Sequence, residues 1–323
     1  MGVAMIRWLG VPGVVFGVLA ALLLPSSVAQ AAGPPDGGRL IALTDQDYDN
    51  RPAARIRVMD PVVADWNSPA AQKWAWAPTS SNGFGDLTNA WGLPTDAKLR
   101  QQNGKHVVLV TDSRGLAAVV SYPSGRRIWG ADVGAPNNPH SIELLPDGNV
   151  AVAASTGGFI RIYTASQGTA SYVTYPLHDA HGVQWDPARQ LLWVLGNNTL
   201  AGLKIGGTPA EPVITEGPVI TLPTGSGHDL SPALDNPDRL WVSTGSKVYQ
   251  VSKSTHEVVT TLDLAAIKSM GSTPTGRQVW TTPKAGCRTT WCTDTVNFAV
   301  PEGTRALSGA EIYKARIWSS RYE

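Results

Sequence analysis

The feature that most constrains the fold is a unit that recurs three times in the middle of the chain. Each copy opens with a histidine, continues as a short apolar strand, turns at a polar segment and returns as a second strand. The copies open at His140, His181 and His228. From Arg39 onward, short alternating apolar runs are bounded by Gly, Pro, Asn and Asp, which is typical of strands and turns. A repeat of this size in an all-strand sequence predicts the blades of a β-propeller.

Two further units open at Trp91 and Met270, and the intervals between successive openings run from 41 to 49 residues. This is the length of four antiparallel strands with their turns. Six such blades fill the chain, whereas seven would need blades shorter than the turn signals allow. The first unit, near Leu40, lacks an innermost strand, so we expect the C-terminal segment to pair with the N-terminal strands and close the ring. We also expect a column of tryptophans to pack between blades, formed by Trp193, Trp241 and Trp280.

The N-terminus has the pattern of an export signal. Arg7 precedes an uncharged apolar run over residues 8–24, and Ala29-Gln-Ala31 has the form of a cleavage site. We predict a secretory signal peptide at 1–31, a short flexible segment at 32–38 and one propeller domain at 39–323. An uncleaved membrane anchor is the alternative. The prediction is therefore a secreted, extracellular protein that has no membrane contact after cleavage.

The composition limits the partners and cofactors. The chain has 26 basic and 25 acidic residues without runs of like charge, which argues against nucleic acid as a partner. Phosphate-binding glycine motifs are absent from the sequence, so we expect no nucleotide cofactor. In an oxidising compartment Cys287 and Cys292 are expected to form a disulfide, with a reactive thiol or a metal ligand as the alternative. We expect a monomer.

The blade openings carry a family resemblance. His140-Ser-Ile-Glu-Leu-Leu-Pro-Asp-Gly-Asn and His181-Gly-Val-Gln-Trp-Asp-Pro resemble the openings of NHL-repeat and gluconolactonase-like propellers. The whole chain also resembles uncharacterised secreted six-bladed propeller-like proteins of actinobacteria. The resemblance implies that first strands start, and second strands end, at one channel mouth. His140, His181 and His228 would then meet there, with Trp91 and Met270 at the equivalent positions. Second-strand ends and their neighbours would add Asp45, Asp112, Arg114, Ser155, Asn197, Asp229, Thr244 and Lys284.

Three converging imidazoles suit a divalent metal, zinc first and manganese or calcium next. The resemblance implies the same arrangement, because peptidyl-amidoglycolate lyases of the NHL group hold zinc with three histidines from separate blades. A metal-free alternative is β-elimination, in which a histidine removes a proton alpha to a carboxylate that Arg114 or Lys284 neutralises. Propeller lyases that act on uronic-acid glycans work in this general way. A purely structural role, in which each histidine donates to a backbone carbonyl of the channel wall, stays open as well.

We therefore predict a six-bladed propeller that acts as a lyase or hydrolase, metal-dependent or not, on an extracellular carbohydrate or small molecule. The alternative is a non-enzymatic propeller that binds a ligand or a protein with the same face. The predicted catalytic residues are His140, His181, His228 and Arg114, with the three histidines as metal ligands. The predicted substrate-binding residues are Asp45, Trp91, Asp112, Asn197, Asp229 and Lys284.

Overall fold

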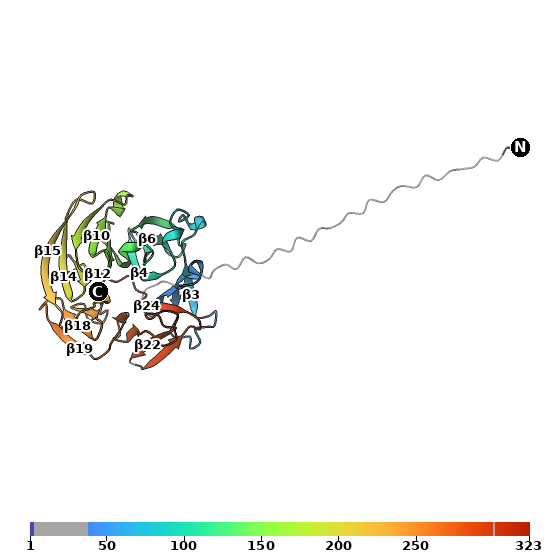
Figure 1. Ribbon diagram of the computed structural model, residues 1–323. Helices are drawn as coiled ribbons and strands as arrows, with labels where there is room; N and C mark the ends of the chain where they lie inside the picture. The colour runs from blue at the N-terminus through green and yellow to red at the C-terminus, as the bar shows by residue number, and fades with distance from the viewer. Residues whose placement is uncertain (3–37, 300) are drawn as a thin grey trace. The chain divides into compact units, whose positions relative to one another are not determined.

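The computed structural model describes residues 1–2, 38–299 and 301–323, and these form six four-stranded antiparallel sheets around a central channel (Figure 1). The predicted six-bladed β-propeller is confirmed. Helical structure in the described residues is limited to five 3₁₀ turns of three residues each. The predicted signal peptide and the segment after it lie almost entirely outside the described residues and stay predictions. No helix in the described part of the chain has the length and apolarity to span a bilayer.

Each blade is a sheet whose strands run in order from the channel outward, apart from the first blade. Blade 1 combines β24 (Glu311–Ile317), β1 (Ile41–Gln46), β2 (Arg55–Met59) and β3 (Gln72–Trp76). Blade 2 comprises β4 (Pro94–Gln102), β5 (Lys105–Asp112), β6 (Leu116–Ser121) and β7 (Arg127–Asp132). Blade 3 comprises β8 (Pro139–Leu144), β9 (Val150–Ala154), β10 (Phe159–Tyr163) and β11 (Tyr172–Pro176). Blade 4 comprises β12 (Ala180–Asp186), β13 (Leu191–Gly196), β14 (Thr199–Gly207) and β15 (Pro212–Thr221). Blade 5 comprises β16 (Asp229–Pro232), β17 (Arg239–Ser243), β18 (Val248–Ser252) and β19 (Val258–Leu262). Blade 6 comprises β20 (Ser269–Ser272), β21 (Gln278–Thr281), β22 (Thr295–Ala299) and β23 (Gly303–Ala306).

The ring closes in blade 1, where the C-terminal strand β24 supplies the innermost strand that the first sequence unit lacks. It pairs antiparallel with β1, from Ile41 opposite Ile317 to Gln46 opposite Glu311. The Thr44 hydroxyl accepts the Lys314 backbone N–H at 2.8 Å and reinforces the seam. Closure removes the unpaired strand edges that an open sheet array would expose, as the sequence predicted.

Apolar side chains pack between neighbouring blades rather than in one central core. Trp193 is fully buried against blade 5, where it packs near Leu230, and Trp241 packs in the same way against Met270 of blade 6. Trp280 breaks the predicted column, because it packs back toward blade 5 in the same cluster as Trp241. The cause is register: β21 pairs Trp280 with Met270, one position out of step with the pairs of Trp193 and Trp241. Trp280 therefore packs between blades 5 and 6, as predicted, but not at the position equivalent to Trp193 and Trp241.

The same registers define which positions at the channel are equivalent. In blades 2, 3 and 4 the pairing of the innermost strand skips one residue near its start, and the skipped residues are Thr95, His140 and His181. His228 and Lys268 directly precede the first pairs of blades 5 and 6. Trp91 and Met270 are therefore not the equivalents of the histidines. In blade 1 the position falls on Tyr313, next to the irregular pairing of β24 with β1.

Candidate functional site at the histidine end of the channel

Six side chains, one from each blade, surround the start of the innermost strands, and we call them the mouth ring. The three predicted histidines lie side by side in it: the ring centroids of His140 and His181 are 4.4 Å apart, and those of His181 and His228 are 5.3 Å apart. Tyr313 lies edge-on to His140 at 5.8 Å. The sequence was right that the three histidines meet. The full mouth ring consists of Thr95, His140, His181, His228, Lys268 and Tyr313.

The contacts of His140 and His181 fix their tautomers. His140 Nδ1 lies 2.9 Å from the Asn138 carbonyl oxygen, and His181 Nδ1 lies 2.9 Å from the Asp179 carbonyl oxygen. A carbonyl oxygen only accepts, so Nδ1 carries a proton in both rings, and in the neutral form of each ring Nε2 has the lone pair. Burial and the neighbouring His181 lower the pKa of His140 well below its usual value. Both rings are thus placed to accept a proton or a hydrogen bond through Nε2.

In His228 it is Nε2, not Nδ1, that has a hydrogen-bond partner in the described part of the chain. Its Nε2 lies 3.1 Å from Lys268 Nζ, and because an ammonium group only donates, Nε2 is the acceptor and Nδ1 carries the proton. That Nδ1 is buried and has no hydrogen-bond partner among the described residues. Burial, the Lys268 charge and then the neighbouring His181 lower the pKa of His228 to about 3. His228 therefore presents an unused N–H donor inside the channel.

Below the mouth ring, charged side chains of the innermost strands form a buried network. In its lower half, Arg100 binds Glu143 through two nitrogens at 2.7 Å, and Lys98 Nζ donates to the Val183 carbonyl. In its upper half, Arg316 binds both oxygens of Asp229 at 2.6 and 2.7 Å. We call this set the channel network. It comprises Asp96, Lys98, Arg100, Glu143, Asp229, Lys314 and Arg316, so four cations face three carboxylates within the described residues.

Lys314, directly below the mouth ring on β24, is the least satisfied member of the channel network. Its side chain is 0% exposed, and Nζ lies 3.0 Å from Asp229 Oδ1. Asp229 is the carboxylate that pairs with Nζ, although the ammonium carries three N–H donors. Asp229 is already bound bidentately by Arg316. Burial lowers the pKa of Lys314, and the Lys314 charge in turn lowers the pKa values of His140 and His228.

The opposite end of the channel is covered by the segment after β24. The Gln184 amide donates to the Tyr322 carbonyl at 2.8 Å, and the Tyr322 hydroxyl donates to the Leu144 carbonyl at 3.1 Å. The Arg100 guanidinium stacks on the Tyr322 ring at 4.5 Å. Between this segment and the channel network lies a cavity of about 40 Å³. The segment after β24 therefore covers this end of the channel.

Several predicted substrate-binding residues make hydrogen bonds to the backbone or to a neighbouring side chain. Asp112 accepts the N–H groups of Gly92 and Leu93 at 2.9 and 2.8 Å and that of Arg114 at 2.7 Å, while burial raises its pKa to about 7. Asp45 pairs with Arg57 at 2.6 Å and accepts the Glu311 N–H. Asn197 accepts the N–H of Ser226 at 2.8 Å. Asp112 and Asn197 stabilise turns on the histidine face, and Asp45 links β1 to β2 and β24.

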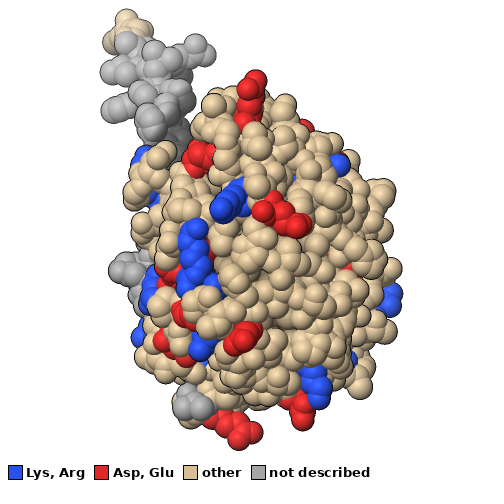
Figure 2. Space-filling model, turned by 90° about the vertical axis from the view of Figure 1, so that its left-hand side faces the viewer, with Lys and Arg blue, Asp and Glu red and all other residues tan. Residues whose placement is uncertain are grey.

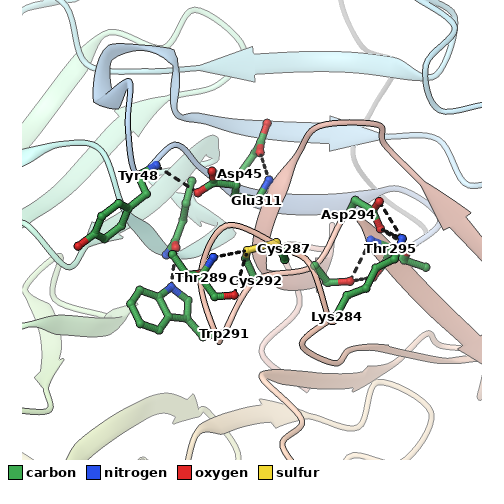
Figure 3. Close-up of a disulfide and its surroundings, with 12 residues drawn as sticks. Asp45, Tyr48, Lys284, Cys287, Thr289, Trp291, Cys292, Asp294, Thr295 and Glu311 are labelled. Atoms are coloured by element: carbon green, nitrogen blue, oxygen red, sulfur yellow. Dashed lines mark hydrogen bonds and ion pairs between the residues drawn. A yellow bond between two sulfur atoms is a disulfide. The ribbon is translucent and has the colours of Figure 1, made fainter.

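In the described structure, neither of the predicted cations, Arg114 and Lys284, makes a hydrogen bond or an ion pair with the three histidines. Lys284 lies on the disulfide loop, where it pairs with Asp294 at 2.7 Å (Figure 3). Trp91 is buried and donates to the Ala54 carbonyl at 3.3 Å, away from the mouth ring. Asp229 does lie in the channel network. The sequence missed Lys268, Tyr313 and Lys314, and the only signal for them is their register with the histidines.

The residues fit a divalent metal poorly. Lys268 occupies Nε2 of His228, and Lys314 adds a second cation beneath the rings. Among the described residues, no group of three or more His, Cys, Asp or Glu side chains is arranged to hold a metal ion. The predicted zinc site stays a prediction, and we derive no chemistry through it.

The comparisons give a family and a fold. The sequence model of a family of unknown function, DUF6528, matches residues 41–320. The chain belongs to this family. The resemblance to NHL-repeat and gluconolactonase-like propellers is not confirmed at the family level. No curated protein matches the chain.

A solved structure is similar to this chain at the level of the fold. It is the crystal structure of a protein of unknown function from Bacteroides caccae, with a TM-score of 0.51 and 11% sequence identity. The match covers 85% of this chain and 97% of that one. The likeness supports the propeller architecture of the family and nothing about its ligand.

Proposed function

We propose that the protein binds a small hydroxylated carboxylate, such as an acidic sugar, at the mouth ring. The observation that carries the proposal is the buried Lys314 ammonium just below the histidines, which has three N–H donors and pairs with Asp229, a carboxylate that Arg316 already binds bidentately. A buried donor that is left without a partner costs about 1–3 kcal/mol, and more when it is charged. A bound carboxylate beside this group would give its remaining donors a partner.

The charge balance favours an anion over a cation. The channel network has one more cation than carboxylates, and Lys268 adds a further positive charge at its upper end. The nearest carboxylate of the mouth is Asp179, whose Oδ1 lies 3.2 Å from His181 Nδ1 and which is half-buried. A ligand carboxylate beside Lys268 would meet its ammonium group, with Lys314 behind it.

His140 and His181 suit the rest of such a ligand. Nε2 of His140 and Nε2 of His181 are acceptors, and hydroxyl groups next to a carboxylate are donors of matching kind. His140 is 8% exposed and His181 is 6% exposed, so the accessible part of the mouth ring is small. These features favour a compact hydroxy acid over a large hydrophobic ligand.

Isothermal titration of the purified protein with acetate, D-glucuronate and D-glucose tests the proposal. We expect glucuronate to bind at least about tenfold more tightly than glucose, a difference of about 1.4 kcal/mol. The Lys268→Met variant should lose this preference, and the Lys284→Met variant, on the same face but paired with Asp294, should keep it. Equal binding of glucose and glucuronate, or no binding of either carboxylate at tens of millimolar, would overturn the proposal.

A lyase activity is the second candidate, and the unprotonated Nε2 groups beside Lys268 favour it. Nε2 of His140 or His181 would take the proton on the carbon alpha to the carboxylate, with the carboxylate neutralised by Lys268. The electron pair would form a carbon–carbon double bond as the bond to the β-oxygen breaks, and Tyr313 would protonate the leaving oxygen. Burial raises the pKa of Tyr313, which keeps its proton available.

The unsaturated acid formed by this step absorbs in the ultraviolet, so activity on uronate-containing glycans is directly measurable. We expect the His140→Ala and His181→Ala variants to lose the absorbance increase. A binding protein would show ligand titration without it. Elemental analysis of the same samples tests the separate prediction of zinc, manganese or calcium.

A further inference from the structure

A groove on the histidine face lies against the disulfide loop and is not part of the mouth ring. The Cys287–Cys292 disulfide closes this loop, which connects β21 to β22, and confirms the predicted pairing (Figure 3). The groove has a volume of about 500 Å³. Its lining consists of Tyr48 and residues 283–291. Because second strands end where innermost strands begin, this loop and the turn after β1 lie on the same face as the mouth ring.

Two aromatic side chains mark the groove. Figure 3 shows the rings of Tyr48 and Trp291 on the same side of the disulfide. The Tyr48 side chain is 46% exposed, although a large apolar ring is normally buried in a soluble protein. Arg288 holds Asp49 at 2.5 and 2.7 Å and covers one side of the Tyr48 ring at 5.4 Å. The result is an aromatic surface flanked by planar polar groups.

Hydrogen bonds link the groove to β4 and β24, two strands that carry mouth-ring residues. Trp291 Nε1 donates to Gln46 Oε1 at 3.0 Å, and the Gln46 amide donates to the Pro94 carbonyl at 3.1 Å. Pro94 directly precedes Thr95 of the mouth ring. On the other side, the Tyr48 N–H donates to Glu311, two residues before Tyr313. The groove is therefore positioned by the first residues of β4 and β24.

We propose that this groove binds a further sugar unit of an acidic oligosaccharide whose carboxylate lies at the mouth ring. This inference rests on the proposed function. Sugar rings present C–H faces that stack on aromatic side chains, and hydroxyl edges that bind charged planar groups such as Arg288 and Asp49. The protein then selects an oligosaccharide over a single acidic sugar.

The test compares D-glucuronate with a β-1,4-linked tetrasaccharide of glucuronate by titration. We expect the tetrasaccharide to bind about tenfold more tightly, and the Tyr48→Ala variant to lose that gain while its affinity for glucuronate stays unchanged. Tyr172→Ala is the matched control, since Tyr172 is 47% exposed and also stacks with an arginine, Arg161.

The outcomes separate the two proposals. If glucuronate and the tetrasaccharide bind equally, or Tyr48→Ala leaves the difference intact, the groove proposal is wrong and the mouth-ring proposal stands. If the tetrasaccharide binds through Tyr48 but Lys268→Met has no effect, the groove stands alone as a sugar site and the carboxylate site is refuted. If neither ligand binds, both proposals fall.

Discussion

Both ends of the channel contain buried charged residues, but these residues differ in how many hydrogen-bond partners they have. At the covered end, Lys98, Arg100 and Glu143 are tied to one another and to backbone carbonyls, and Tyr322 closes over them. At the histidine end, His228 Nδ1 is buried without a hydrogen bond to a described residue, and Lys314 shares its one paired carboxylate, Asp229, with Arg316. Both ends carry buried charge, but their cations differ in how many partners they have. We propose the histidine end as the binding site because of this difference and not because its charge is buried.

This comparison separates stability from function. A satisfied buried ion pair holds the innermost strands in one arrangement, and loss of one partner leaves an uncompensated charge. An unsatisfied buried group lowers stability until something binds it. The surface adds little to this contrast: Figure 2 shows acidic and basic side chains interspersed on the face in view, without a large area of one sign.

The largest effect is expected at the covered end. Glu143→Gln removes the charge that Lys98 and Arg100 share, so we expect the free energy of unfolding to fall by about 3–5 kcal/mol. Urea denaturation followed by tryptophan fluorescence measures it. Glu257→Gln, at an exposed site, should change stability by less than about 0.5 kcal/mol. A loss at Glu143 as small as this control would break the contrast between the two ends.

The histidine end should respond to pH. The folded-state pKa of His228 lies at about 3 against about 6.5 unfolded, so its contribution is complete above pH 6.5 and is lost as pH falls toward 3. The groups around it are Lys268, His181, Lys314 and Asp179. We expect stability to fall from pH 6.5 to 4.5, before the carboxylates of the channel network protonate.

The His228→Gln variant should flatten that fall. Each pKa unit corresponds to about 1.4 kcal/mol, so over the two units from pH 6.5 to 4.5 the difference between wild type and variant should reach about 3 kcal/mol. The raised pKa of Asp112 makes its contribution to stability more favourable at lower pH. This contribution cancels in the difference, because both proteins contain Asp112. Parallel stability curves for the two proteins would show that His228 is not a neutral buried group.

The sequence predicted the fold, the blade count, the closure and the meeting of the histidines, because these depend on repeats that the chain spells out. It did not predict Lys268 or Tyr313 in the mouth ring, because no histidine marks their blades and equivalence follows from register irregularities. It also assigned Asp45 and Asp112 to a ligand. Their partners are backbone N–H groups and Arg57, brought close only by the turns of the folded chain.

The smallest expected effect on stability tests the contrast most directly. Lys314→Met removes an ammonium that pairs with Asp229, and Asp229 keeps both of its bonds to Arg316. We expect the free energy of unfolding to change by less than about 1 kcal/mol, in either direction, although Lys314 is 0% exposed. The same variant should weaken binding of glucuronate about tenfold, since the charge behind Lys268 is gone. A loss of stability as large as that of Glu143→Gln, with ligand binding intact, would show that Lys314 is a structural ion-pair residue. The charged residues at both ends of the channel would then serve stability alone.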